Sequence, residues 1–293
     1  MATGFKTTDI NLPAQVSSEI LQKVQEASAV MRLARRTTLP GTGISVPIIT
    51  GDPEAEWVTE TGEKKVSKGS AELRMMTPYK LAVIQPFSME FRRNAPALYD
   101  ALVARMPGVL AQKFDGTVFG AYNKPGDNFD QFKNCTAQSL SGNGTTAAYD
   151  ALVAADTDIA THGGITNGFV LSPQGKGLLL SVKDTTGRPI FINSVAEGAI
   201  PMILGSPTYQ SKGAYIAGTP GKVPNTVGVV GDWTQASYGT VEGVRASISD
   251  QATIVVGSET INLWQRNMFA VLMEIEVGFR ADTTVFNKLT AAA

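Results

Sequence analysis

Histidine and cysteine, two side chains that often serve as nucleophiles, bases or metal ligands, each occur once in this sequence. They are His162, beside Gly163 and Gly164, and Cys135. One histidine and one cysteine cannot build the common zinc sites of Cys and His ligands. The G-x-S-x-G pattern of a serine nucleophile is absent from the sequence. We therefore interpret His162 as a solvated loop residue and expect no catalytic or metal-binding residue.

Two other patterns could bind a phosphate or a cation. Gly175-Lys176 and Gly221-Lys222 lack the upstream glycine of a P-loop, and neither lysine precedes Ser or Thr. Carboxylates suit hard cations, and an acidic cluster contains Asp52, Glu54, Glu56 and Glu60. This cluster lacks the spacing of an EF-hand, so we interpret it as a solvated face. The sequence thus predicts no cofactor and no enzyme activity.

Charge and composition narrow the class of protein further. Of 293 residues, 25 are Lys or Arg and 26 are Asp or Glu, which argues against a dedicated nucleic-acid binder with a basic face. Charged residues make up only 17%, which is low for a free surface, so we expect other subunits to cover much of it. No signal peptide, membrane span or intrachain disulfide is expected, and the sequence indicates synthesis in a cytoplasm-like compartment.

A helix over residues 94–122 is the longest element that the sequence predicts. Its apolar residues recur at steps of three and four and so share one face. Asn94 is expected to cap its first turn, and the Lys124-Pro125-Gly126-Asp127 run to end it. Such a helix spans roughly 40 Å and needs a sheet or other helices along its apolar side. The residues expected on that side are Leu98, Leu102, Met106, Val109, Leu110, Phe114 and Val118.

Residues 52–77 are expected to form a long two-stranded excursion, called the arm below. The arm contains one tryptophan, Trp57, and almost no apolar mass of its own. Because an isolated two-stranded ribbon is only marginally stable in water, we expect the arm to lie on a neighbouring subunit. A flexible surface loop is the alternative.

The remaining segments predict mixed α and β structure. Residues 1–12 read as an extended arm, and a helix is expected from Pro13 to about Arg35. Between 128 and 254, short strands alternate with two helices, as in a compact α/β lobe. Strands are also expected over 41–50, 79–87 and 263–280, of which the last two could pair near the long helix.

A series of short segments follows a definite order along the chain. They are Leu12-Pro13, Ala55-Glu56-Trp57-Val58-Thr59-Glu60, Tyr79-Lys80-Leu81-Ala82, Phe87-Ser88, the long helix, Phe169-Val170-Leu171-Ser172-Pro173, Gly187-Arg188-Pro189-Ile190, Val230-Gly231-Asp232-Trp233 and Val277-Gly278-Phe279. In this order they resemble the major capsid proteins of tailed bacteriophages with the HK97-like fold. The resemblance covers nearly the whole chain and depends on the order and spacing of the segments.

The resemblance implies an α+β, HK97-like capsid fold with a long spine helix, a mixed axial lobe, an extended E-loop and an N-terminal arm. The N-terminal arm and helix would cover 1–38, and the E-loop 52–77. The axial (A) domain would cover 128–254. The peripheral (P) domain would combine 39–51, 78–127 and 255–293, with the spine helix at 94–122.

The resemblance also implies a structural role, in which this major capsid protein self-assembles into pentamers and hexamers of an icosahedral shell. The shell would enclose double-stranded DNA without sequence-specific binding, as a near-neutral chain allows. The protein would be part of the virion after assembly in the host cytoplasm, without a membrane. Portal and decoration proteins are the expected partners, together with a separate scaffolding protein or none. A cleaved internal scaffold is not expected, because the N-terminal arm begins almost at Met1.

Two sets of site residues follow from the resemblance. The E-loop is expected to make the main intersubunit contact through Glu56, Trp57, Glu60, Lys64, Lys65, Lys68 and Arg74. Some relatives also join an E-loop lysine to a P-domain asparagine by an isopeptide bond, with help from a glutamate. Here the candidates are Lys64, Lys65 and Lys68 with Asn262 and Asn267, although we expect these lysines to be simply solvated.

Two alternative functions stay open at this point. An encapsulin-type nanocompartment shell protein would share the fold, and co-purifying cargo enzyme would reveal it. A cytoplasmic α/β enzyme is the second alternative, and the scarcity of histidine, cysteine and nucleotide-binding motifs argues against it.

Overall fold

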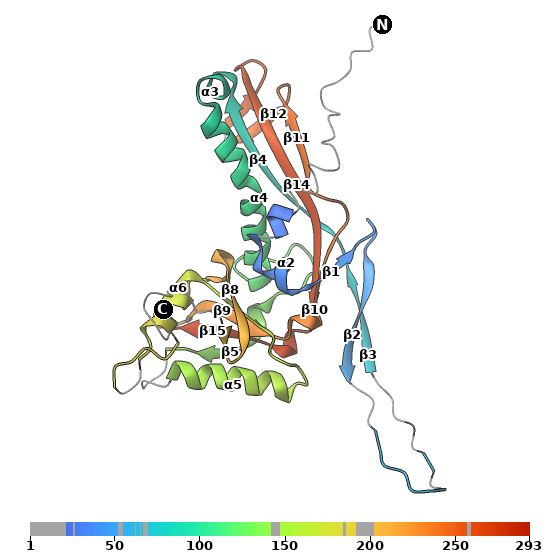
Figure 1. The fold of residues 1–293 in the computed structure, drawn as a ribbon. Coiled ribbons are helices and arrows are strands. Elements are labelled where there is room, and N and C mark those ends of the chain that lie inside the picture. The colour runs from blue at the N-terminus through green and yellow to red at the C-terminus, as the bar shows by residue number, and fades with distance from the viewer. Residues whose placement is uncertain are drawn as a thin grey trace.

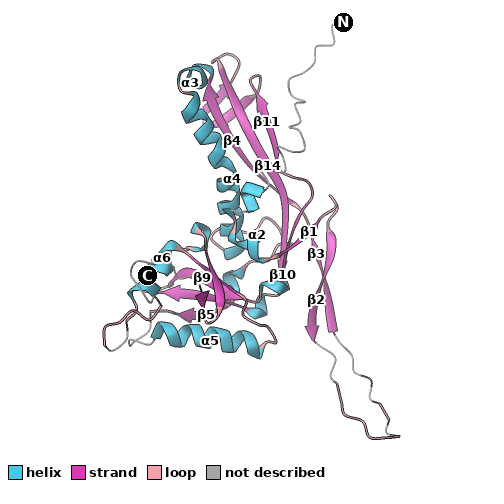
Figure 2. Cartoon of the chain, in the orientation of Figure 1, coloured by secondary structure: helices cyan, strands magenta, loops and turns pink. Residues whose placement is uncertain are grey.

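The structure is a computed structural model, and it describes most of the chain from Gln22 to the C-terminus (Figure 1). Outside the described residues lie 1–21, 26, 52–54, 62, 65, 67–69, 142–146, 184–185, 192–201 and 257–258. The expected N-terminal arm over 1–12, and most of the helix expected after Pro13, therefore lie outside the described residues. The fold combines helices and strands, which confirms the α+β class (Figure 2).

A long sheet forms the upper body of the molecule in Figure 1. Its central strand is β14 (Met268–Ala281), which pairs along one edge with β4 (Tyr79–Ser88). Along its other edge, β14 pairs first with β11 (Arg245–Ser249) and farther along with β10 (Ala236–Thr240). β1 (Arg35–Thr38) pairs in parallel with the free edge of β10. The antiparallel pairing of β4 with β14 confirms the sequence prediction, although β4 is only partly buried.

The expected helix over 94–122 is α4 (Pro96–Phe119), and a separate short helix, α3 (Met89–Asn94), precedes it; both lie along the long sheet (Figure 1). Ala95 separates the two helices with a non-helical backbone, φ −137° and ψ 59°, because a residue before proline avoids the helical conformation. The prediction that Asn94 caps the long helix was therefore wrong. The helix ends at Gly120, whose φ of 95° favours glycine, and not at the 124–127 run.

A second, six-stranded sheet forms the lower lobe in Figure 1. Its strands in spatial order are β5 (Thr136–Ser139), β15 (Phe286–Ala291), β9 (Asn225–Gly231), β6 (Gly168–Leu171), β8 (Ser206–Gln210) and β7 (Met202–Ile203). The helices α5 (Ala147–Thr161) and α6 (Pro173–Ser181) belong to this lobe. Short 3-10 turns lie at Phe132–Asn134, Lys212–Ala214 (η3), Trp233–Gln235 and Thr283–Val285.

The two sheets do not follow the domain boundaries expected from the sequence. β10 and β11 lie between 128 and 254, yet they pair with β14 in the long sheet. β15 lies at the C-terminus, yet it pairs with β9 and β5 in the lobe. The expected helix to Arg35 also ends early, because α2 (Ala29–Leu33) gives way to β1, which pairs with β10. The chain thus crosses between the sheets several times.

Two strand pairs extend from this body. β2 (Ile44–Gly51) and β3 (Ser70–Met76) form a ribbon that projects away from both sheets (Figure 1). β12 (Thr253–Val256) and β13 (Glu259–Asn262) pair at the far end of the long sheet.

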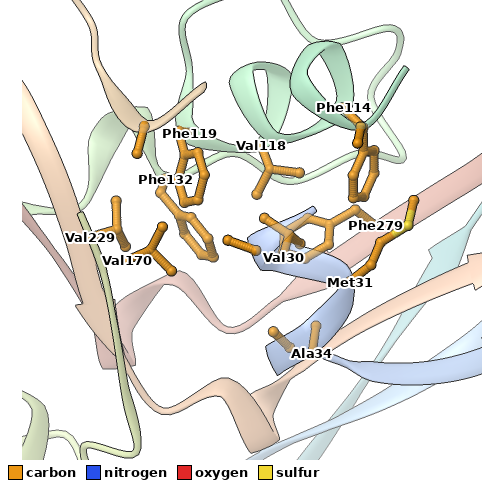
Figure 3. Close-up of a cluster of buried hydrophobic side chains, with 14 of the residues drawn as sticks. Val30, Met31, Ala34, Phe114, Val118, Phe119, Phe132, Val170, Val229 and Phe279 are labelled. Atoms are coloured by element: carbon orange, nitrogen blue, oxygen red, sulfur yellow. The ribbon is translucent and has the colours of Figure 1, made fainter. Parts of the chain in front are cut away.

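The main core lies where helices and both sheets meet (Figure 3). Phe114 and Phe119 of α4 point toward Phe132 and toward Phe279 of β14. Phe132 stacks on Phe286 of β15, with 4.4 Å between ring centroids. Because aromatic side chains bury large areas and pack with defined geometry, this cluster holds the two sheets and α4 together.

Candidate assembly surface

The β2–β3 ribbon is attached to the body at one end only. Its strands pair antiparallel from Ile44 opposite Met76 to Gly51 opposite Ser70. At the attached end, Val46 and Met76 pack with Leu39 in a small buried cluster. About 25 Å of two-stranded ribbon therefore extends from a narrow base, at roughly 3.4 Å per residue.

Arg280 of β14 fastens the base of the ribbon. Its Nε donates to the carbonyl of Met75 at 2.7 Å, and its Nη2 donates to Asn128 Oδ1 at 2.9 Å. Its Nη1 pairs with Asp130 Oδ1 at 2.9 Å, and the Arg280 side chain is 8% exposed. A buried ion pair that is also hydrogen-bonded holds its partners in one geometry. The sequence analysis did not identify Arg280, because its partners are far away in the sequence.

Beyond the base, the arm exposes large apolar side chains. Trp57 has a relative exposure of 102%, and Val66 and Leu73 are 88% and 70% exposed. A single exposed apolar residue needs no explanation, but a group of them on one thin projection indicates a contact surface. Trp57 is thus exposed in the segment between β2 and β3, and its role as a contact residue stays a prediction.

The charged residues expected on the arm fall into two groups. Glu56, Glu60 and Lys64 are exposed, whereas Lys65 and Lys68 lie outside the described residues, as do Asp52 and Glu54 of the acidic cluster. Arg74 is directed to its own chain: its Nη2 lies 2.8 Å from Glu72 Oε2, and its Nη1 lies 3.5 Å from the carbonyl oxygen of Ala281. The hydrogen bond to Glu72 raises the pKa of Arg74, so this guanidinium stays charged.

The two candidate asparagines lie at the opposite end of the molecule. Asn262 ends β13, and its Oδ1 accepts a hydrogen bond from the backbone N–H of Gln265 at 3.2 Å. The carbonyl of Asn267 accepts from the N–H of Met89 at 3.1 Å. Figure 1 shows the β12–β13 hairpin at one end of the molecule and the arm at the other. Within one subunit the structure does not bring these asparagines and the arm together.

Asp115 is a buried carboxylate that sequence reasoning missed. It lies on α4, accepts hydrogen bonds from the hydroxyls of Ser28 at 2.5 Å and Ser211 at 2.7 Å, and accepts another from the N–H of Ala29 at 3.0 Å. Burial raises the pKa of Asp115 to about 6, and these hydrogen bonds oppose the increase. One side chain thereby joins α4 to the start of α2 and to the segment after β8.

The two residues with the most obvious reactive side chains do not form a reactive site. His162 is exposed at the end of α5, where its ring Nδ1 lies 2.8 Å from the carbonyl oxygen of Asp158. Cys135 is buried, and burial raises the pKa of its thiol to about 12, which keeps the thiol protonated. Among the residues that the structure describes, no three His, Cys, Asp or Glu side chains gather where they could hold a metal ion.

Comparison with known proteins gives a consistent group of relatives. The model of the phage capsid family matches residues 9–281. A probable major capsid protein of Mycobacterium phage D29 is 28% identical over 95% of this chain and 89% of its own length. The major capsid protein of Staphylococcus phage 80alpha is 24% identical over 97% of this chain and 86% of its own.

Solved structures with the same fold come from similar sources. A chain from Gordonia phage Cozz has a TM-score of 0.72 at 22% identity, over 91% of this chain and 87% of its own. A chain from Mycobacterium phage Adephagia has a TM-score of 0.70 at 19% identity, over 100% of this chain and 95% of its own. A chain from the capsid of an empty GTA particle has a TM-score of 0.62 at 15% identity, over 91% of this chain and 90% of its own. At these identities the likeness concerns the fold, which is HK97-like.

Proposed function

Because this chain belongs to the phage capsid family and is a phage major capsid protein, we propose that its arm, the E-loop over 52–77, is the main contact that builds the shell. The arm of each subunit lies across an adjacent copy, so that every subunit places its arm on one neighbour and receives the arm of another. Pentamers and hexamers joined in this way close an icosahedral shell around double-stranded DNA. The work of this protein is therefore assembly, and we propose no catalytic role for it.

The observation that carries this proposal is the exposed apolar surface of an arm attached only at its base. Trp57, Val66 and Leu73 are largely exposed in one subunit, while the buried cluster of the ribbon lies at its attached end. Burying such groups on a neighbour removes apolar surface from water, which stabilises association by about 25 cal/mol per Å². In a free subunit these side chains stay in water and give no such stabilisation, so burial of the arm favours the assembled state.

We propose a domain division that follows the sheets rather than the sequence boundaries. The peripheral domain comprises the long sheet with α3 and α4, including β1, β10 and β11. The axial domain comprises the six-stranded sheet with α5 and α6, including β15. The axial domains would meet around the five- and six-fold positions, and the arm would reach the peripheral domain of a neighbour.

The partners follow from the same role. A chain with a formal net charge of −1 neutralises few phosphates, so the shell encloses DNA without sequence-specific contacts. Separate scaffolding, portal and decoration proteins would complete the head, and the protein would reside in the virion after assembly in the host cytoplasm. No helix in the described part of the chain is long and apolar enough to cross a membrane.

Shortening the arm tests this function. A variant in which a short turn replaces residues 53–69 keeps β2, β3 and the buried cluster at their base. We expect it to remain a folded, soluble subunit that forms no closed shells, as measured by size-exclusion chromatography and negative-stain microscopy. The matched control replaces residues 142–146, the segment before α5, with a short turn.

The wild-type protein is expected to form shells, or rings of five or six subunits, under the same conditions. Normal shells from the shortened variant would contradict the proposed role of the arm. A wild-type chain that stays monomeric even beside the co-expressed head-assembly proteins of its phage would contradict the assembly function itself.

A further inference from the structure

A cavity of about 340 Å³ opens on the side of the molecule between the last turns of α4 and the long sheet. Its walls are mostly apolar and come from β4, β14, α4 and the segment after α4. The wall residues are Tyr79, Leu81, Phe114, Thr117, Phe129 and Val277. A concave site of this size and character lies within the range that binds a small ligand or a single anchoring side chain.

Two exposed lysines are among the residues that line this cavity, and we call their edge of it the mouth. Lys113 of α4 lies over the ring of Tyr122, with its Nζ 3.2 Å from the ring centroid. Lys80 of β4 lies 3.4 Å from Glu276 and 3.8 Å from Glu274, so its charge is already partly balanced. No acidic side chain of the described residues forms an ion pair with Lys113. The mouth therefore favours an apolar group that carries a carboxylate beside it.

The arm carries a group with this chemistry. Trp57 is fully exposed at 102%, and the exposed carboxylates of Glu56 and Glu60 lie one and three positions away. Figure 1 shows the described part of the connection between β2 and β3 far from the long sheet of the same subunit. A Trp57 side chain that enters such a cavity must therefore belong to another copy.

We propose that the cavity receives the Trp57 side chain of a second copy of this chain, and that Glu60 of the incoming arm pairs with Lys113 at the mouth. This inference rests on the proposed function, because it assumes that arms lie on neighbouring subunits. Tryptophan is the residue type most enriched at the anchoring positions of protein interfaces, where it fills a pocket inside a less critical rim. Here the rim is charged, so the pairing also selects the direction of the arm.

Tryptophan fluorescence can test the burial of Trp57 directly. The chain has three tryptophans: Trp57, the buried Trp233, and Trp264, which is 73% exposed. In a Trp264→Phe background, Trp57 is the one exposed emitter. We expect its acrylamide quenching constant to fall several-fold, and its emission to move to shorter wavelength, when subunits assemble into shells.

Filling the cavity tests where Trp57 goes. Thr117→Phe places a bulky side chain at the cavity wall, and Gln112→Phe is the matched control on the exposed surface of α4. We expect Thr117→Phe to fold, as judged by thermal unfolding, but to assemble poorly or to leave Trp57 quenchable. Gln112→Phe should behave like the parent. Shells of Thr117→Phe that form normally and shield Trp57 as in the parent would overturn the proposal.

A disulfide test locates the contact without relying on a bulky residue. Trp57→Cys combined with Thr117→Cys should give a ladder of disulfide-linked subunits from oxidised shells, whereas Val66→Cys with Thr117→Cys should give none. Cys135 is buried and does not compete. Shells that form while Trp57 stays equally quenchable, or that give no ladder with the first pair, would overturn the inference and leave the proposed function intact. A wild-type chain that forms no shells or rings, even beside the co-expressed head-assembly proteins, would instead overturn the proposed function.

Discussion

Asp115 shows how a single side chain can hold distant parts of this chain together. Three donors from two segments converge on its carboxylate: the hydroxyls of Ser28 and Ser211 and the backbone N–H of Ala29. Ser28 also caps α2, because its Oγ accepts from the N–H of Met31 at 3.1 Å. Removing the carboxylate would leave several buried donors unpaired, at about 1–3 kcal/mol for each group.

The titration of Asp115 predicts a pH dependence of stability. Its pKa is about 6 in the folded subunit, above the ordinary value of 3.8. Between these values the folded state keeps a proton that the unfolded chain releases, so the free energy of unfolding falls as the pH rises from 4 to 6 and then levels off. A shift of about two units corresponds to about 3 kcal/mol.

Urea unfolding of Asp115→Asn and wild-type subunits between pH 4 and pH 7 measures this effect. Because the amide does not titrate, the stability of Asp115→Asn relative to wild type should rise across this range. Asp127→Asn, which changes a fully exposed carboxylate beside Lys124, should follow the wild-type curve. Parallel curves for wild type and Asp115→Asn would show that Asp115 does not titrate in this range.

At this scale the sequence predicted some residues and missed others for a clear physical reason. Trp57 could be singled out from the sequence because it stands alone in a polar, core-free segment, and the structure shows it exposed, while its contact role stays a prediction. Asp115 could not, because its partners Ser28 and Ser211 are 87 and 96 positions away and carry no local pattern. Arg280 was missed likewise, since its partner Asp130 is 150 positions away.

The elements show the same division between local and distant information. The apolar periodicity of α4 correctly predicted a helix with Met106, Leu110, Phe114 and Val118 buried. It wrongly placed Leu98, Leu102 and Val109 in the core, since they are 53%, 37% and 51% exposed. Periodicity identifies which face of a helix is apolar. It does not say how much of that face another element covers.

The contact between α4 and η3 predicts a position that tolerates no larger residue. A Cβ added at Gly213 would lie 2.7 Å from the backbone nitrogen of Gly116 and 3.0 Å from the carbonyl oxygen of Gln112. Backbone atoms cannot move aside cheaply, so Gly213→Ala should lower the free energy of unfolding by about 1–3 kcal/mol.

Gly108→Ala, on α4, is the matched control, because no atom lies within 4 Å of the added Cβ. It should be neutral or stabilise the subunit by about 0.5–1 kcal/mol, since alanine favours a helix interior over glycine. Chemical denaturation of the two variants measures both values. Equal effects from the two substitutions would show that η3 does not pack closely on α4.

At the scale of the whole molecule, the core and the arm have different roles: the core stabilises the folded subunit, and the arm presents a contact surface. The core joins both sheets and α4 through interlocking aromatic rings, so the body can stand as one folded unit. The arm shares little of that core and exposes its apolar residues. Low charge across the chain fits the same division, because a surface destined for burial against copies needs fewer charges.

The position of the arm also bears on whether subunits are joined covalently. An isopeptide bond would form when the Nζ of a lysine attacks the Cγ of an asparagine and ammonia leaves. Lys64 is exposed to water, and Asn262 already holds a hydrogen bond within its own turn. Bond formation would need the lysine and the asparagine to be held together in one fixed geometry, and neither side chain is held for this within the subunit. We therefore expect the arms to hold the shell by non-covalent contacts alone.

Boiling assembled particles in SDS with reductant checks this expectation. The particles should give a single band at the monomer mass of 31.0 kDa, because detergent removes the apolar contacts of the arms. Lys64→Arg, which keeps the charge and cannot form the bond, should give the same band and the same shells. A ladder of larger bands from wild type that disappears in Lys64→Arg would instead show that the arm of one subunit reaches an asparagine of the next and is bonded to it.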